Sequence, residues 1–402
     1  MNFVPAINWI IGVLVLVCGS NFQIAYSIMN PDIAQDLNIS LSHIALAASI
    51  HMWCFSIFQL FTGIILDYYG IKRILPISIL FIFTGTFLFS YSDYRICFFI
   101  SQIFLSFGAS FGFVGAGYIS YKFFSYLKSG IMFGFVQAAY SISSLLMEYT
   151  YIFLISHGIS WRDLIRYIEY LEIAVFILTL LLTDCKWSAN LKRSSISIRK
   201  LLSEVFYNII ELISLRDIWF STIVGSLMFG IFLSVAILWG QKLLIALKLS
   251  TYYSGLVHSV IWIGFAIGSP LVNFVSRIVK NRKYVFMSFC VLQCISLMLL
   301  LCSSSNLYIL CILMFTFGFA SGGHMLNFSI GTDIVDETKV GTVCSIINGF
   351  MSISGGIIIF IIGLVLEYQN KYNIIEISFF MPIITFLSLV FLFFCRETFH
   401  IK

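Results

Sequence analysis

A polar hinge of eleven residues decides the fold: Gly63-Ile64-Ile65-Leu66-Asp67-Tyr68-Tyr69-Gly70-Ile71-Lys72-Arg73. One acid, two glycines and two bases lie here between two long apolar runs. Glycine adopts backbone conformations that other residues avoid, so two helices can reverse direction within a few residues. The two bases favour the cytoplasmic side of a membrane. The stretch therefore predicts a tight cytoplasmic turn between two membrane-spanning helices.

The composition is that of a membrane protein. Of 402 residues, 60% are hydrophobic and only 10% are charged, which is too few for the surface of a soluble protein of this size. Apolar runs of about 20 residues recur along the chain, and each is long enough to cross a bilayer. Their length and their lack of strand-type alternation favour helices over a barrel. The twelve expected spans are 7–29, 43–65, 74–92, 96–119, 130–155, 166–184, 217–243, 251–275, 284–303, 307–330, 341–366 and 375–395.

The distribution of lysine and arginine predicts the orientation. With both termini cytoplasmic, most of the 23 basic residues fall in inner loops and tails. The outer loops then hold only Arg95, Arg162, Arg166, Lys242, Lys248 and Lys371. The net charge of +5 follows from this bias, and no basic patch suggests nucleic-acid binding. Abundant Ile, Phe, Asn and Lys indicate an AT-rich bacterial genome, so we expect a multi-pass protein of a bacterial inner membrane.

The two halves of the chain repeat each other. Phe107-Gly108 recurs 210 residues later as Phe317-Gly318, and the hinge has a weaker counterpart at 273–283. Ser141-Ile142-Ser143 recurs 211 residues later, at 352–354. In the same register, Gln137 corresponds to Asn348. A duplicated six-helix unit places a binding site at the membrane midplane between the halves.

The longest polar segment separates the halves. It contains the stretch 201–213, whose apolar residues fall at helical spacing. We expect this stretch to be a linker helix on the inner membrane surface. The predicted domains are an N-terminal six-helix bundle at 1–184, a cytoplasmic linker at 185–216 and a C-terminal six-helix bundle at 217–402.

With these features the chain resembles the major facilitator superfamily of secondary transporters. Their loop between the second and third helices has the form G-x-L-x-D-x-x-G-x-[KR]-[KR]. Apart from Ile65 in place of Leu, the pattern is matched at Gly63, Asp67, Gly70, Lys72 and Arg73. The resemblance implies an all-α membrane protein with twelve transmembrane helices in two pseudo-symmetric bundles. It also implies that the five matching residues form a conformational gating loop.

Other motifs extend the likeness over nearly the whole chain. Gly268-Ser269-Pro270 is similar to the start of the second-half loop of the family, although Arg277 stands where an acid is usual. Within that family, the chain resembles the branch that contains phagosomal transporters of intracellular bacteria and lysosomal dipeptide carriers. Two departures argue against a proton-driven drug exporter. Gln102 replaces an Arg six residues before Gly108, and the fifth span lacks a G-P-x-x-G-G run.

Glu148 is the only acid that we place clearly within a span, in its outer half. An ionisable group in a membrane is costly and is by default a candidate functional residue. Three interpretations remain open. Glu148 could carry a coupling proton, bind a cationic part of the substrate, or be an outer-mouth residue paired with Arg162 or Arg166.

The remaining candidates on a substrate or proton pathway are histidines and amides. His51, His258 and His324 lie within spans, and a lone membrane histidine is more often a packing residue than a functional one. His324 stands out because Asn327, three residues later, can face the same way. Buried amides need hydrogen-bond partners, which a substrate can supply. The amide candidates are Asn21, Gln23, Gln102, Gln137 and Asn348.

These observations predict a secondary active transporter that moves a small organic solute, such as an amino acid or short peptide, by alternating access. Symport with H+ is one option for the coupling. An enzyme is not expected, because no H-E-x-x-H, G-x-S-x-G or Walker sequence occurs. We expect no cofactor or metal, and a monomer whose partners are the substrate and the lipid bilayer. The alternative is a non-transporting sensor or scaffold on a transporter fold.

Overall fold

The computed structural model describes residues 4–91, 94–123, 126–182, 197–335, 340–368 and 373–399. Within these ranges every regular element is a helix, which confirms the predicted all-α fold. The first group of helices is α1 (Val4–Asp36), α2 (Leu41–Tyr69), α3 (Ile71–Ser90), α4 (Arg95–Phe123), α5 (Tyr126–Ser156) and α6 (Trp161–Leu182). A linker helix, α7 (Ile198–Ile213), follows.

The second group begins with α8 (Arg216–Ser234), which continues through the π-helix η2 (Val235–Trp239) into α9 (Gly240–Ala246). The other members are α10 (Thr251–Val279), α11 (Arg282–Leu301), α12 (Leu307–Ser321), η3 (Gly322–His324), α13 (Met325–Ile334), α14 (Val340–Tyr368), α15 (Ile374–Ser378) and α16 (Phe380–Phe394). Among the described residues, ten helical segments are long and apolar enough to cross a membrane. The first and sixth expected spans fall on α1 and α6.

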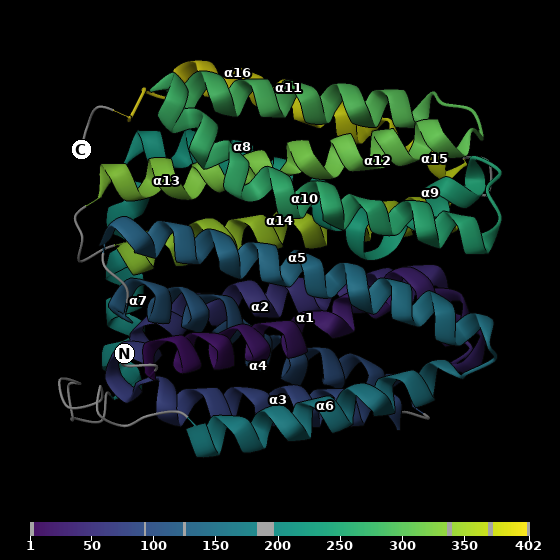
Figure 1. Ribbon diagram of the computed structural model, residues 1–402, viewed down its shortest axis with the longest axis horizontal. Coiled ribbons are helices and arrows are strands. Elements are labelled where there is room, and N and C mark those ends of the chain that lie inside the picture. The colour runs from purple at the N-terminus through teal and green to yellow at the C-terminus, as the bar shows by residue number, and fades with distance from the viewer. Residues whose placement is uncertain are drawn as a thin grey trace.

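The helices lie side by side as an elongated bundle (Figure 1). The α3 and α6 helices form one edge, and α11 and α16 form the opposite edge. The two groups meet where α2 packs against α14 and α5 packs against α10. We call the end that carries α9 and α15 the α9 end, which sequence analysis predicts to be outer. The other end, where α7 lies, is the α7 end.

Turns with left-handed residues recur at matching places in the two groups. Gly70 has φ 73°, and its N–H donates to the Leu66 carbonyl at 2.9 Å, so the predicted hinge is a tight α2–α3 turn. Lys280, 210 residues later, has φ 54° and joins α10 to α11. Asn38 (φ 47°) and Lys248 (φ 71°) form a second pair with the same offset. The repeat detected in the sequence thus extends to backbone conformation.

The repeated Phe-Gly motif marks close helix crossings. Ser78 on α3 donates to the Gly108 carbonyl at 2.7 Å, and a Cβ at Gly108 would lie 2.6 Å from the Ser78 carbonyl oxygen. A Cβ at Gly318 would overlap the Ile261 carbonyl on α10. Glycine at both places lets two membrane helices approach at backbone distance.

Apolar packing joins the two groups near the α9 end. It joins Ile28 and Ile33 of α1 to Val235 and Leu243 of the second group. At the α7 end, α7 packs against α2, α8 and α14, and Tyr68 donates to Glu204 of α7 at 3.3 Å. The predicted linker helix is confirmed as a helix. Its position on the membrane surface stays a prediction.

Candidate functional site

The two groups are joined at the α5–α10 contact by a buried ion pair. Glu148 of α5 and His258 of α10 are both 0% exposed. A Glu148 carboxylate oxygen, Oε1, is in short hydrogen-bond contact with Nδ1 of His258. Its other oxygen accepts a hydrogen bond from Nε1 of Trp262 at 2.8 Å. Trp262 follows His258 by four residues, so both side chains project from one face of α10.

The position of the proton on His258 follows from its second contact. Nε2 lies 3.0 Å from the Val235 carbonyl oxygen, which can only accept. Nε2 therefore carries a hydrogen, and the proton between Nδ1 and Glu148 is an additional one. In this geometry the pair holds one proton more than a neutral imidazole and an ionised carboxylate hold when apart.

Gly240, which directly follows the π-helix, leaves room for this contact. In η2 the Gly240 N–H donates to Val235, five residues back, and the same carbonyl also faces His258. A Cβ at Gly240 would lie 2.6 Å from the His258 ring. Tyr140 of α5 and Phe232 of α8 pack edge-on against Trp262, with ring centroids 5.7 and 5.5 Å away. Elements of both groups thus hold the pair in place.

One interpretation of Glu148 is wrong. It does not pair with the arginines of the α5–α6 turn. Arg162 pairs instead with Asp36 at 2.9 Å, and Arg166 pairs with Asp163 at 2.9 Å. Sequence reasoning also favoured a packing role for a lone histidine, whereas His258 is the partner of Glu148. Nothing local signals this pairing, because 110 residues separate the two.

The other candidate residues do not gather around the pair. Gln102 donates to the Phe98 carbonyl at 3.3 Å and to Ser101 at 3.0 Å within its own helix. Within the described residues no side-chain hydrogen bond involves the amides of Gln137 and Asn348, which are 4% and 8% exposed. Gln23 is half-buried, and the side chain of Asn21 lies outside the described part.

His324 and Asn327 lie inside the second group. Nδ1 of His324 is 2.8 Å from the Ser321 carbonyl, and its ring stacks on Phe229 with centroids 4.3 Å apart. Asn327 is 0% exposed, and in the described part of the chain neither of its polar side-chain atoms has a partner. His51 of α2 is 1% exposed, and both ring nitrogens lack partners there too.

The predicted gating loop forms the α2–α3 turn. Lys72 and Arg73 are exposed at the start of α3, and Gly63 faces Ser345 of α14, whose Oγ would lie 3.8 Å from an added Cβ. The side chain of Asp67 lies outside the described part of the structure, so its role stays a prediction.

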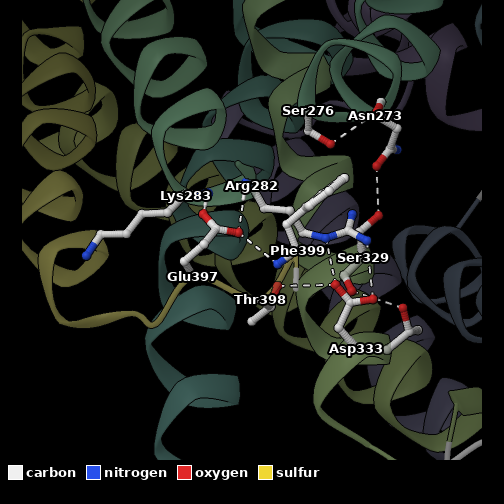
Figure 2. A network of polar contacts seen from close by, with 10 residues as sticks. Asn273, Ser276, Arg282, Lys283, Ser329, Asp333, Glu397, Thr398 and Phe399 are labelled. Atoms are coloured by element: carbon white, nitrogen blue, oxygen red, sulfur yellow. Dashed lines mark hydrogen bonds and ion pairs between the residues drawn. The ribbon is translucent and has the colours of Figure 1, made fainter. Parts of the chain in front are cut away.

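The corresponding loop of the second group holds a polar network that sequence analysis missed (Figure 2). Nε of Arg282 lies 2.6 Å from Oδ2 of Asp333 on α13. Glu397 accepts hydrogen bonds from the backbone N–H groups of Arg282 and Lys283, both at 3.0 Å. Burial alone would raise the pKa of Glu397, but four backbone N–H donors hold the pKa below its usual value. Acids from two other segments thus contact the α10–α11 turn.

Two buried acids also escaped the sequence analysis, so the expectation that Glu148 is the only acid inside a span is corrected. Glu172 is 0% exposed and Glu169 is 7% exposed, and both lie in α6. Thr86 of α3 contacts Glu172 at 2.9 Å, and Ser90 contacts Glu169. The expected span 166–184 already contained both residues, and its polar first half concealed them.

Comparison with known proteins gives a match to one protein family. The family model described as Major Facilitator Superfamily matches residues 11–359. None of the curated proteins compared with the chain matches it.

Proposed function

The chain belongs to the Major Facilitator Superfamily of membrane transporters, and from this premise we propose that it is a proton-coupled secondary transporter of a small organic solute. The Glu148–His258 pair carries the proposal. It links α5 to α10, across the surface where the two groups must separate for alternating access. It also holds one proton more than an ionised carboxylate and a neutral imidazole hold when apart.

The proton would enter when the α9 end closes. When that end is open, Glu148 and His258 are separated and exposed to water, and a proton binds as they come together. Once they are paired, both groups are removed from water. Without the proton, the buried Glu148 charge would lack its charged partner, and loss of one partner from a buried ion pair typically costs about 3–5 kcal/mol. Closure is therefore favoured only when the proton is present.

Loss of the proton toward the α7 end would reset the carrier. An ionised Glu148 would then face an unprotonated Nδ1, because the remaining imidazole hydrogen is directed to Val235. Nδ1 has no hydrogen to donate in that state, so the closed contact weakens. The empty carrier can then reopen at the α9 end, which is the order of steps that symport requires.

The substrate class is proposed from the polar groups that remain free. The amides of Gln137 and Asn348 are available to donate to and accept from a neutral or zwitterionic solute. Amino acids and short peptides fit this chemistry. The orientation that we propose keeps both termini cytoplasmic in a bacterial inner membrane.

The test uses purified protein in proteoliposomes with an imposed pH gradient. A panel of amino acids, dipeptides, nucleosides and sugars identifies the substrate by accumulation. Glu148→Gln should abolish accumulation but retain exchange of substrate between the two sides, because glutamine mimics the protonated acid. Thr150→Val, at an exposed position two residues further along α5, is the matched control and should behave like the parent protein.

Two outcomes would contradict the proposal. If Glu148→Gln accumulates substrate as well as the parent, the pair is structural and the coupling group lies elsewhere. If no solute of any class is transported or exchanged, the sensor or scaffold alternative takes its place.

A further inference from the structure

Glu172 forms a second buried acid site, inside the first group of helices and apart from the α5–α10 contact. It lies on α6, which packs against α3 and α1 at one edge of the bundle (Figure 1). Its carboxyl is 0% exposed, and among the described residues its single hydrogen-bond partner is the hydroxyl of Thr86. The second oxygen, Oε2, has no partner there. A buried carboxyl with so few donors requires an explanation.

The number of hydrogen atoms available at the Thr86 hydroxyl explains how this carboxyl is accommodated. The hydroxyl has one hydrogen, yet it lies 2.9 Å from the Ile82 carbonyl and 2.9 Å from Glu172 Oε1. If Glu172 is ionised, one hydrogen must serve two acceptors, and a buried charge keeps at most one hydrogen bond. If Glu172 is protonated, it donates to Thr86, which donates to Ile82 in turn. Only the acid form satisfies this chain of contacts.

The surrounding groups favour the same form. Those that interact electrostatically with the Glu172 carboxyl are Cys18 of α1, Tyr151 of α5 and Glu169 of α6. Each of these is neutral or negative, and from α3 the hydroxyl groups of Thr86 and Ser90 contact Glu172 and Glu169, respectively. The nearest basic residue on α6, Arg166, is paired with Asp163 at the end of the helix. Among the residues that the structure describes, no cation interacts with Glu172 to offset the burial of a negative charge there.

A row of polar groups connects this acid to the α9 end. Glu169 lies one helical turn closer to that end and contacts the Ser90 hydroxyl. Arg162 donates to the Ser90 carbonyl at 2.8 Å and reaches the partly exposed Asp36. Polar groups thus extend from the surface of the bundle to Glu172, along the contact between α3 and α6.

We propose that Glu172 is a proton-binding site, occupied in this conformation and loaded from the α9 end through Glu169. The site does not depend on the proposed transport cycle, because it is defined without substrate and on helices away from the Glu148–His258 pair. It gives the protein a second proton whose binding stabilises the packing of α6 against α3 and α1.

Infrared spectroscopy of the purified protein at neutral pH tests the site. The difference spectrum between the parent and Glu172→Gln should show loss of the carbonyl stretch of one protonated carboxyl group. If a carboxylate band is lost instead, Glu172 is ionised and the proposal fails. In Glu169→Gln the protonated band should remain, but its shift on transfer to heavy water should be slower. An unchanged exchange rate would refute the route through Glu169.

Thermal unfolding gives a second readout, independent of the spectra. Glutamine keeps the shape of the neutral acid, so Glu172→Gln should unfold at a higher temperature than the parent in mildly alkaline buffer. The difference in unfolding temperature should shrink as the pH falls toward the pKa of a free carboxyl. At that pH Glu172 of the parent is protonated in both the folded and the unfolded protein, so its protonation no longer lowers the stability. A variant that is less stable than the parent in alkaline buffer would show that the native site prefers the charged carboxylate.

Discussion

Replacement of Gly240 by alanine tests how the π-helix positions the ion pair. The new methyl group would lie 2.5 Å from the Val235 carbonyl oxygen and 2.6 Å from the His258 ring, at the place where these two groups hydrogen bond. Loss of a hydrogen bond to a charged group costs about 1.5–3 kcal/mol. Overpacking of a tight site costs about 1–3 kcal/mol more.

The expected penalty is therefore roughly 2.5–6 kcal/mol, from these two contributions together. It falls on the conformation in which Glu148 and His258 meet. Even the lower figure shifts the equilibrium toward an open α9 end by about two powers of ten, since each 1.4 kcal/mol is tenfold. A single methyl group without charge should therefore weaken proton coupling.

Distance measurements between spin labels report this shift. Labels at Gln35→Cys and Lys248→Cys lie on exposed positions of the two groups at the α9 end, in a protein that also carries Cys302→Ser. In the parent the short distance should dominate, and in Gly240→Ala the longer distance should. Gly115→Ala is the control, because its methyl would meet only Leu75 at an ordinary 3.4 Å. An unchanged distance distribution in Gly240→Ala, with accumulation intact, would refute the reasoning.

Three further predictions follow from the polar ends of the helices. Glu397→Gln should lower the unfolding temperature at neutral pH, because the pKa of this carboxyl is lowered in the folded protein. The ionised carboxylate therefore contributes stability above its unfolded pKa of about 4.3, and this stability is lost as the pH falls through the folded pKa. A difference in unfolding temperature that persists in strong acid would contradict this. Asp67→Asn should slow transport while leaving substrate affinity in detergent nearly unchanged, since the α2–α3 turn lies at the α7 end; a large loss of affinity would place Asp67 in the binding site. Cysteines introduced at Asn190 and Asn370 should react with an impermeant reagent in intact cells only at position 370, and the reverse pattern would invert the predicted topology.

The features predicted from the sequence depend on local patterns. Apolar runs of membrane length and the glycine hinge at Gly70 need no knowledge of distant residues, and the fold follows from them. Glu148 was found for the same reason, because an acid within an apolar run is visible locally. Its pairing with His258, itself a candidate, was not predicted, since only the packing of α5 on α10 brings the two residues together.

Other features could not be predicted, for physical reasons. The five residues of the π-helix are as apolar as the α-helical residues on either side, so no sequence pattern marks the π-helix. Asp333 and Glu397 reach the α10–α11 turn from separate segments of the chain. Glu172 follows the charged first turns of α6. Its burial depends on the packing of α3 and α1 against α6, which cannot be deduced from the sequence of α6 alone.

The π-helix at Val235–Trp239 also affects how this chain should be aligned with its relatives. Its wider turn holds one residue more than an α-helical turn, and each residue of an α-helix turns the chain by about 100°. An alignment without a gap would compare α9 with the wrong residues of any relative that lacks this turn. A single codon gained or lost here would therefore rotate Gly240 into or out of reach of His258. In evolution, the proposed proton site could thus arise or disappear in one step, while the lengths of the flanking membrane helices stay the same.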